Sequence, residues 1–379
     1  MKIIIIGGVA QSLINFRGDL IKSFLNANYD VVCISGETDH KYVEQLEKLG
    51  CKFIPCKLKR TSLNPLADLL LLFNFIMIFR QEKPDVILAY TIKPVVWGGI
   101  ASKLFSRTKF YGLITGLGFS FQKGSLKRNI LCSLVKRLYK FALSGASGVI
   151  FQNSDNQNVF IKNRLINREV STVVPGSGVN LSHFAQTPLP KGKITFLMIS
   201  RLLGEKGVRE YIEAAKQIRT RYQNVSFHLV GPIDSSPDGI PQNEVLEWQE
   251  SRYIEYFGSS SDVRPFIEAC HVFVLPSYHE GMPRTVLEAM SMARPILTTE
   301  VPGCKDTVTP GVNGFLVQHG RADLLAERVG WFIDNEESLQ EMGQKSRCMA
   351  EDIFDVRKIN ASLFDIMSLK RNFNDKKTI

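Results

Sequence analysis

Residues 271–290, HVFVLPSYHEGMPRTVLEAM, contain the pattern on which the fold assignment depends. The first seven residues are apolar enough for a buried strand. The last eight are typical of a helix with Pro283 in its first turn, where the fixed φ of proline is favourable. Glu280 and Gly281 then lie in a short link over the carboxyl end of the strand. A strand that is apolar on both faces and leads into a helix predicts a parallel sheet covered by helices on both sides.

The same alternation of short apolar runs and longer amphipathic stretches extends along the 379-residue chain. Strands are expected at 2–8, 30–36, 52–58, 84–90, 109–116, 194–201, 226–231, 253–258, 271–277 and 295–300. Helices are expected at 12–27, 39–50, 64–83, 205–222, 262–270 and 283–293. A segment rich in glycine, proline and serine at 173–193 separates the two series.

The chain is longer than one ordinary hydrophobic core serves, so two domains are expected. We therefore predict an α/β protein in which two doubly wound Rossmann-like domains, at 1–185 and 190–350, face a central cleft. Residues 351–379 are expected to supply a C-terminal helix that packs back toward the first domain. Seven scattered cysteines without metal-like spacing indicate reduced thiols and a cytoplasmic protein.

Basic residues are concentrated in the first half of the chain. The net charge is +13 over residues 1–190 and −3 over the remainder, and residues 86–154 contain ten basic and no acidic side chains. Such an asymmetry indicates an anionic partner, such as nucleic acid, phosphorylated lipid or a membrane surface. Solubility alone is the simpler alternative.

Two segments of the first half bear on membrane contact. Residues 69–79, LLLLFNFIMIF, are fewer than the ~20 that span a bilayer, and we expect a packed helix rather than a membrane insert. Residues 126–141 place apolar side chains at helical spacing and carry five basic ones. Such a helix either lies on an anionic bilayer or covers a core with its basic side in water, and the sequence leaves both alternatives open.

The link at Glu280 has the features of a site for a nucleotide sugar. The following helix offers free N–H groups and the positive end of a dipole, which suit a phosphate group. Gly281 allows a ligand to approach the backbone closely. Glu280 and Glu288 are expected to accept hydrogen bonds from vicinal hydroxyls, as on ribose or a hexose.

The cations that such a site requires occur in residues 200–208, SRLLGEKGV, after the first strand of the same half. Arg201 is expected at the end of that strand and Lys206 just before the next helix. Arginine grips a phosphate with two hydrogen bonds, and lysine acts as a point charge. Each alone is more often a surface charge, but together with the carboxylates they are specific for a nucleotide-diphosphate-sugar site.

With these motifs, the chain resembles a family 4 glycosyltransferase of GT-B fold over nearly its whole length. The matching segments are the glycines at 7–8, RLLGEKGV, VGP, the loop that contains Asp262, VFVLPSYHEGMPRTVLEAM, TEVPGCKDTV and GVNGFLV. Through SLINFRGDLI, AYTIKPVVWG and ITGLGFSF, the first half is similar to a bacterial branch of that family. Members of the branch add N-acetylhexosamine or related sugars to undecaprenyl-diphosphate-linked saccharides.

The resemblance implies roles for the candidate residues. Glu280 would hold hydroxyls of the donor sugar, while Arg201 and Lys206 would neutralise the departing diphosphate, so these three are the expected catalytic residues. Glu288 would hold the ribose. The residues expected to bind the donor are Gly8, Arg201, Lys206, Gly281, Met282, Pro283 and Glu288.

Three residues of the first half are candidates for contact with the acceptor or its diphosphate. These are Asn15, Arg17 and Lys93, and a solvated surface position explains each of them at least as well. Some members of the family place a histidine in the first domain where this chain has LITGLG. This segment contains no histidine, so no such role is assigned to it. His279 is expected to be solvated or to cap the helix.

The reaction implied is glycosyl transfer with retention at the anomeric carbon. The donor would be a UDP-sugar, GalNAc or GlcNAc, and the acceptor a polyprenyl-diphosphate-linked saccharide of bacterial surface-glycan or N-glycan assembly. The sequence contains no D-x-D, so we expect no metal and no cofactor. The enzyme is expected on the inner face of the plasma membrane, held peripherally to the anionic surface through its basic first domain, with no nucleic acid as partner.

Other functions share some of these features. A hexosyl or deoxysugar transferase of O-antigen or capsule synthesis, or a non-catalytic nucleotide-sugar-binding membrane protein, would use the same donor site. A dehydrogenase would share the first strand and an acidic residue such as Glu37, but GGVAQS is not G-x-G-x-x-G. A hydrolase would need Glu280 and Glu288 across a scissile bond, whereas Glu288 is expected on the flank of a helix.

Overall fold

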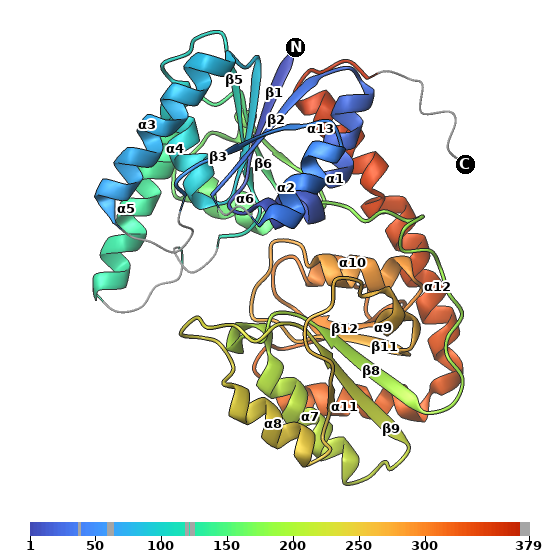
Figure 1. The fold of residues 1–379 in the computed structure, drawn as a ribbon. Coiled ribbons are helices and arrows are strands. Elements are labelled where there is room, and N and C mark those ends of the chain that lie inside the picture. Colours follow the sequence, from blue (N-terminus) through green and yellow to red (C-terminus); the bar gives the residue numbers. More distant parts are fainter. Residues whose placement is uncertain (37–38, 59–63, 118–120, 122–125, 372–379) are drawn as a thin grey trace. The chain divides into compact units, whose positions relative to one another are not determined.

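The computed structural model describes residues 1–36, 39–58, 64–117, 121 and 126–371 (Figure 1). The chain forms two compact units. Unit 1 contains Met1–Ser177 and the described part of Arg357–Ile379, and unit 2 contains Gly178–Val356. Each unit has its own parallel sheet, which confirms the predicted pair of Rossmann-like α/β domains.

Unit 1 is built on a seven-stranded sheet in the order β3-β2-β1-β4-β5-β6-β7. All neighbouring strands are parallel. The strands are β1 Lys2–Ile6, β2 Asp30–Ser35, β3 Lys52–Pro55, β4 Val86–Tyr90, β5 Lys109–Ile114, β6 Gly148–Phe151 and β7 Ser171–Val173. Strand order reverses beside β1, as in doubly wound nucleotide-binding folds.

Helices cover both faces of this sheet because its strands are apolar on both sides. Ile4 and Ile6 of β1 face a core closed by α3, α4, α5 and α6, whereas Ile3 and Ile5 face a second core closed by α1 and α13. The helices are α1 Ala10–Asn26, α2 His40–Lys48, α3 Pro65–Glu82, α4 Ile92–Ser102, α5 Leu126–Leu143, α6 Ser154–Lys162 and α13 Val356–Ile366.

The last helix, α13, packs against the first. The ring of Phe364 lies 5.0 Å from that of Phe24. The side chain of Asn360 donates a hydrogen bond of 3.2 Å to Ser23. Residues of the second core therefore come from both ends of the chain, and the chain enters unit 2 and returns.

Unit 2 is built on a six-stranded parallel sheet in the order β10-β9-β8-β11-β12-β13. Its strands are β8 Ile194–Ile199, β9 Val225–Val230, β10 Glu255–Tyr256, β11 Val272–Leu275, β12 Ile296–Thr299 and β13 Gly314–Val317. Its helices are α7 Val208–Arg219, α8 Gln242–Glu250, α9 Arg264–Glu268, α10 Arg284–Ser291, α11 Ala322–Asp334 and α12 Leu339–Met349. None of the described helices of either unit combines the length and apolarity needed to cross a bilayer.

The structure corrects several expected elements. Strands β6 Gly148–Phe151, β7 Ser171–Val173 and β13 Gly314–Val317 were not predicted. Pro283 precedes α10 at its N-cap and is not in its first turn. The helix expected from residue 205 starts at Val208, after a 3₁₀ turn at Gly204–Lys206.

A fully buried arginine fixes the end of α10 to the segment that leads into the sheet of unit 2. The Arg294 guanidinium donates to the carbonyl oxygens of Thr187 and Pro188 at 2.9 and 3.0 Å. It also donates to the carbonyls of Ile267 and Glu268, the last two residues of α9, at 2.9 and 3.1 Å. One buried side chain thus satisfies backbone acceptors from two separate segments.

We expect Arg294→Met to lower the free energy of unfolding of unit 2 by about 3 kcal/mol or more, because several buried carbonyls lose their donor at once. Chemical denaturation followed by tryptophan fluorescence measures this, since Trp248 and Trp331 both lie in unit 2. Arg321→Met is the matched control, because Arg321 is half-exposed and pairs only with exposed Asp323. Equal midpoints for the two variants would contradict the assignment.

Candidate active site

The two predicted motifs of unit 2 meet because the strands that precede them are neighbours. Strands β8 and β11 pair in parallel, with Phe196 opposite Val272, so the loops at their carboxyl ends lie side by side. Lys206 in the first loop donates a hydrogen bond of 2.6 Å to Glu280 in the second. Each of these side chains is 16% exposed, so the ion pair is largely shielded from water.

A glycine allows the two loops to approach this closely. Gly207 ends the 3₁₀ turn with φ +74°, and a Cβ at this position would lie 2.1 Å from the carbonyl oxygen of Pro276. The backbone N–H of Tyr278 donates to the carbonyl of Glu205 at 2.9 Å. The hydroxyl of Ser277 donates to the same carbonyl at 3.2 Å. Backbone contacts therefore fix the register in which Lys206 faces Glu280.

A second ion pair lies beside the first. The Nε2 atom of His279 is 3.1 Å from a carboxylate oxygen of Glu205. The hydrogen bond from His279 lowers the pKa of Glu205, and burial opposes that shift. His279 thus contacts Glu205 and is not simply solvated, and the sequence analysis missed this partner because Glu205 is remote in the chain.

Arg201 is at the end of β8, as predicted, and has a partner of its own. Its Nη1 atom lies 2.9 Å from Oδ2 of Asp234, and its side chain is 44% exposed. Hydrogen bonds from Ser236 lower the pKa of Asp234 most, and Arg201 adds to the shift. Both predicted phosphate-binding cations of unit 2 are therefore already paired with carboxylates.

Glu288 lies on α10 and is buried. Its Oε1 atom accepts a hydrogen bond of 2.8 Å from Nε of Arg284, one turn earlier on the helix. Burial raises the pKa of Glu288, and the guanidinium of Arg284 opposes this rise. One oxygen of the Glu288 carboxylate, which was expected to accept two hydroxyls, thus already accepts a hydrogen bond from Arg284. Arg284 is a site residue that the sequence analysis did not single out.

The residues between the two glutamates pack closely on the loop that follows β12. Gly281 and Pro283 are buried, and Met282 is half-buried. Gly303 has φ +81°, and a Cβ there would lie 2.5 Å from the carbonyl oxygen of Gly281. The loop after β12 therefore packs closely against the backbone of the predicted donor motif.

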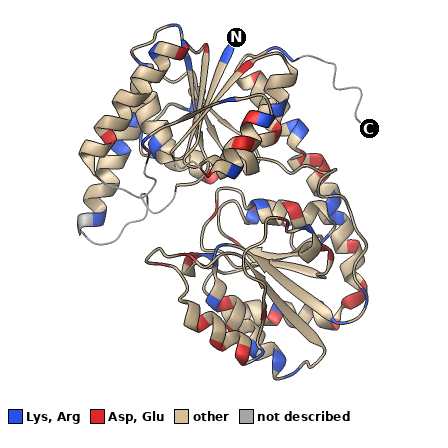
Figure 2. Ribbon diagram, in the orientation of Figure 1, with Lys and Arg blue, Asp and Glu red and all other residues tan. Residues whose placement is uncertain are grey.

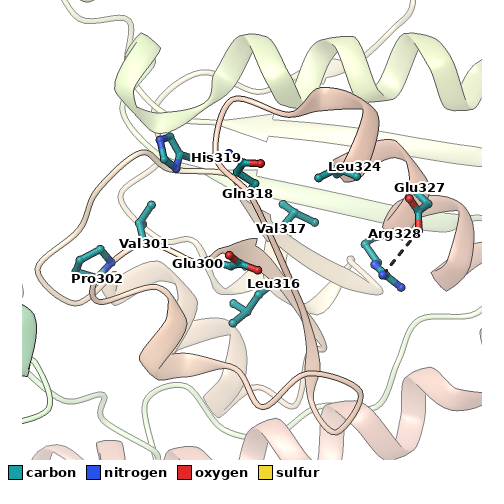
Figure 3. Close-up of a pocket in the computed structure, with 10 residues that line it drawn as sticks. All are labelled: Glu300, Val301, Pro302, Leu316, Val317, Gln318, His319, Leu324, Glu327 and Arg328. Carbon is teal, nitrogen blue, oxygen red and sulfur yellow. Dashed lines mark ion pairs between the residues drawn. The ribbon is translucent and has the colours of Figure 1, made fainter.

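A cavity of about 660 Å³ opens at the ends of β12 and β13 (Figure 3). Its polar lining includes Glu300 after β12, His319 after β13 and Arg328 on α11. It contains none of the predicted site residues, but the ring of His319 lies 5.2 Å from that of Tyr278, next to the Glu280 loop. Its lining comes from three separate segments. Two of them overlap TEVPGCKDTV and GVNGFLV, but the sequence analysis assigned no site residue there.

The candidates of the first half lie within unit 1. Gly8 is buried after β1, and a Cβ on it would lie 3.5 Å from the hydroxyl of Thr91. Asn15 is exposed on α1, whereas Arg17 is only 2% exposed and lies 5.1 Å from the ring centre of Tyr90. Arg17 is therefore not on a solvated surface.

Lys93, the remaining candidate, begins α4 and pairs with Asp68 of α3 at 2.7 Å. Both side chains are largely buried, so this lysine is not simply solvated either. Glu37 lies outside the described residues, as do Gly118, Phe119 and Ser120 of the segment ITGLGFSF.

The structure thus brings Lys206 and Glu280 into contact and places Glu288 a little over one turn into α10. Arg201 lies on the same strand end as the loop of Lys206. The first turn of α10 presents backbone N–H groups beside a cation, an arrangement that suits a phosphate group. Carboxylates next to it suit sugar hydroxyls, so the site has the chemistry that binds a nucleotide sugar.

Comparison with known proteins agrees with this chemistry. Residues 180–349 match the family model described as Glycosyl transferases group 1, and residues 8–153 match Glycosyl transferase 4-like. The chain is 28% identical to N,N'-diacetylbacillosaminyl-diphospho-undecaprenol alpha-1,3-N-acetylgalactosaminyltransferase of Campylobacter jejuni, over 89% of this chain and 90% of that protein. It is 25% identical to capsular polysaccharide biosynthesis glycosyltransferase CapM of Staphylococcus aureus, over 91% of each.

A third relative is UDP-Gal:alpha-D-GlcNAc-diphosphoundecaprenol alpha-1,3-galactosyltransferase of Escherichia coli, at 26% identity over 77% of each chain. Among solved structures, Anabaena HepE in complex with UDP superposes with a TM-score of 0.78 at 21% identity, covering 97% of this chain and all (100%) of that one. Sucrose-phosphate synthase of Thermosynechococcus elongatus gives a TM-score of 0.79 at 18% identity, covering 97% and 98%. The chain therefore belongs to the family 4-like glycosyltransferases of GT-B fold, with a Glycosyl transferase 4-like region followed by a Glycosyl transferases group 1 region.

Proposed function

We propose that this glycosyltransferase moves GalNAc or GlcNAc from a UDP-linked donor to a saccharide carried on undecaprenyl diphosphate, with retention at the anomeric carbon. The contact between Lys206 and Glu280 beside the N-terminus of α10 carries the proposal, because it joins a phosphate-binding group to a hydroxyl-binding one. Two relatives support the acceptor, since both are named for diphospho-undecaprenol substrates. The complex of HepE with UDP supports the nucleotide.

The charges of the site suit the departure of a nucleotide diphosphate. As the bond between the anomeric carbon and the β-phosphate oxygen breaks, negative charge grows on that phosphate. Lys206, Arg201 and the N-terminus of α10 would stabilise this charge more than the charge of the ground state. The new bond forms from the acceptor hydroxyl on the same face of the sugar, and the hydroxyl proton passes to a β-phosphate oxygen. No protein base and no metal are needed in this proposal.

In each of these ion pairs, the carboxylate also positions its cation. Glu280 holds Lys206 in place before the donor binds, and Asp234 does the same for Arg201. A bound diphosphate would then contact Lys206 and Arg201 alongside their carboxylates. Glu280 would use its remaining acceptor positions for hydroxyls of the donor sugar. The site is thereby preorganised, so that little side-chain entropy is lost on binding.

A transferase for another hexose or a deoxysugar of capsule or O-antigen synthesis is the second candidate. The similarity to CapM, which is named for capsular polysaccharide biosynthesis, favours it. Purified protein should be incubated with UDP-GalNAc, UDP-GlcNAc, UDP-galactose and UDP-glucose, each with a short-chain lipid-diphosphate saccharide acceptor. We expect turnover with an N-acetylhexosamine donor. Turnover only with another hexose selects the second candidate, and binding of every donor without turnover indicates a nucleotide-sugar-binding protein.

Lys206→Ala should lower kcat by about 100-fold, as the removal of one oxyanion donor does in other enzymes. Arg201→Ala should act in the same direction. Lys216→Ala is the matched control, because Lys216 lies on α7 with Glu213 as its partner and should leave kcat unchanged. Steady-state kinetics with a saturating donor measures the effect. A kcat for Lys206→Ala within error of the control would refute the assignment.

Glu288 should make binding of UDP depend on pH. Because burial raises its pKa, a growing fraction of Glu288 is protonated as the pH falls from about 7 to about 5, and a neutral carboxyl accepts ribose hydroxyls less well. Calorimetry should therefore show weaker binding of UDP at the lower pH in the wild type. Glu288→Gln should bind weakly at both values. The phosphate of UDP titrates identically in both proteins, so parallel pH profiles would contradict this role.

A further inference from the structure

The outward face of α3 is apolar, which is unusual for a helix at the surface. Five large side chains on this face, between 48% and 71% exposed, define the α3 stripe. The α3 stripe consists of Leu66, Leu69, Leu70, Phe73 and Met77. Leu66, Leu70, Phe73 and Met77 follow one another at intervals of three or four residues. Leu69 lies three residues after Leu66 and four before Phe73, so all five share one side of the helix.

The opposite side of α3 already supplies the packing that the fold requires. Leu71, Phe75 and Phe79 are buried against the sheet of unit 1. A helix with one face in a core normally carries polar residues on the other, because exposed apolar area costs free energy. We expected residues 69–79 to be a packed helix, and this holds for only half of its circumference. The other half indicates a second apolar environment.

Helix α5 offers a related surface, but a basic one. Its exposed side chains at the same helical spacing are Ile130, Leu134, Arg137 and Phe141, which define the α5 stripe. The Nζ atom of Lys103 lies 5.2 Å from the centre of the Phe141 ring, and Lys140 is also exposed. Apolar and cationic groups therefore alternate along this helix, as in helices that lie in the interface of an anionic bilayer.

The two stripes belong to one side of unit 1. Helix α4 packs against both α3 and α5, and all three cover the same face of the sheet (Figure 1). Figure 2 shows α3 almost entirely in the tan of uncharged residues, while Lys and Arg are the only charged residues of α5. Residues 86–154, which include α4 and α5, contain ten basic and no acidic side chains.

We propose that this face docks on an anionic membrane, with the α3 stripe inserted among the acyl chains and the α5 stripe lying against the headgroups. Residues 86–154 carry no acidic side chain, and Asp68, which lies beside the α3 stripe, is paired with Lys93. This charge favours an anionic lipid surface over a second copy of the chain, whose matching face would carry the same positive charge. This inference deepens the proposed function, because a membrane-docked face would place unit 1 next to a lipid-linked acceptor. The inference assigns the apolar part of membrane binding to α3 and the salt-dependent part to α5.

Sedimentation of the full chain with sucrose-loaded vesicles tests the inference. The vesicles contain phosphatidylcholine with or without phosphatidylglycerol, at low and high salt. The wild type should bind the anionic vesicles and keep part of its binding at high salt, because the contact of α3 is not electrostatic. Leu69→Ser combined with Phe73→Ser should lower the partition coefficient by about tenfold or more at both salt concentrations.

Two further variants separate the contributions. Arg137→Gln with Lys140→Gln should remove the preference for anionic vesicles and leave the salt-resistant binding in place. Leu246→Ser with Phe257→Ser is the matched control, because these apolar residues are similarly exposed in unit 2, and it should bind like the wild type. Circular dichroism verifies that all variants are folded.

The outcomes separate this inference from the proposed function. Transfer to a short-chain, water-soluble acceptor should be unaffected by the α3 variant, whereas transfer to a long-chain acceptor in vesicles should fall with its binding. Vesicle binding that persists in a protein without transferase activity would refute the proposed function and leave the inference intact. Unchanged binding of the α3 variant would overturn the inference. So would a dimer of the wild type that the α3 variant dissolves, since a second copy would then cover the stripe.

Discussion

The parallel pairing of β8 with β11 is the constraint on which the site in unit 2 depends. It places the carboxyl ends of the two strands, Ile199 and Leu275, next to each other although they are 76 residues apart in the sequence. Gly207 then lets the loops touch, and the backbone bonds from Tyr278 to Glu205 hold them in register. The contact between Lys206 and Glu280 follows from this geometry and needs no further adjustment of either side chain. Pairing at the centre of a buried sheet is among the most rigid features of a domain, so the site inherits that rigidity.

The cations of the site are already paired with carboxylates in the structure. Lys206, Arg201 and Arg284 each contact a carboxylate, at 2.6, 2.9 and 2.8 Å. Partial burial makes an unpaired charge costly, so pairing keeps the empty site stable. It also holds each cation close to the place where a phosphate would lie. In the reaction that we propose, the same carboxylates can then turn to hydroxyl groups, which need acceptors and carry no charge.

Unit 1 shows how one helix can serve two apolar environments. The inner side of α3 fills the core beside α4, and its outer side remains exposed. This explains why residues 69–79 are apolar except for Asn74 and show no amphipathic period. Periodicity identifies a helix with one apolar face, but a helix that is apolar all round gives no sign of which face is buried.

The sequence by itself determined the fold class and the position of the link at Glu280 between a strand and a helix. Apolar strands that alternate with helices require a covered parallel sheet, and the apolar run at 271–277 followed by a helix places the link at a strand end. Only the tertiary structure decided the partners of the site residues: Asp234 for Arg201, Arg284 for Glu288, and Glu205 for His279. It also decided that Arg17 is buried and that short strands such as β13 complete the sheets. The physical reason is that local hydrophobicity determines which segments form buried strands. Contacts between loops depend instead on the order of the strands in the sheet, which no local pattern encodes.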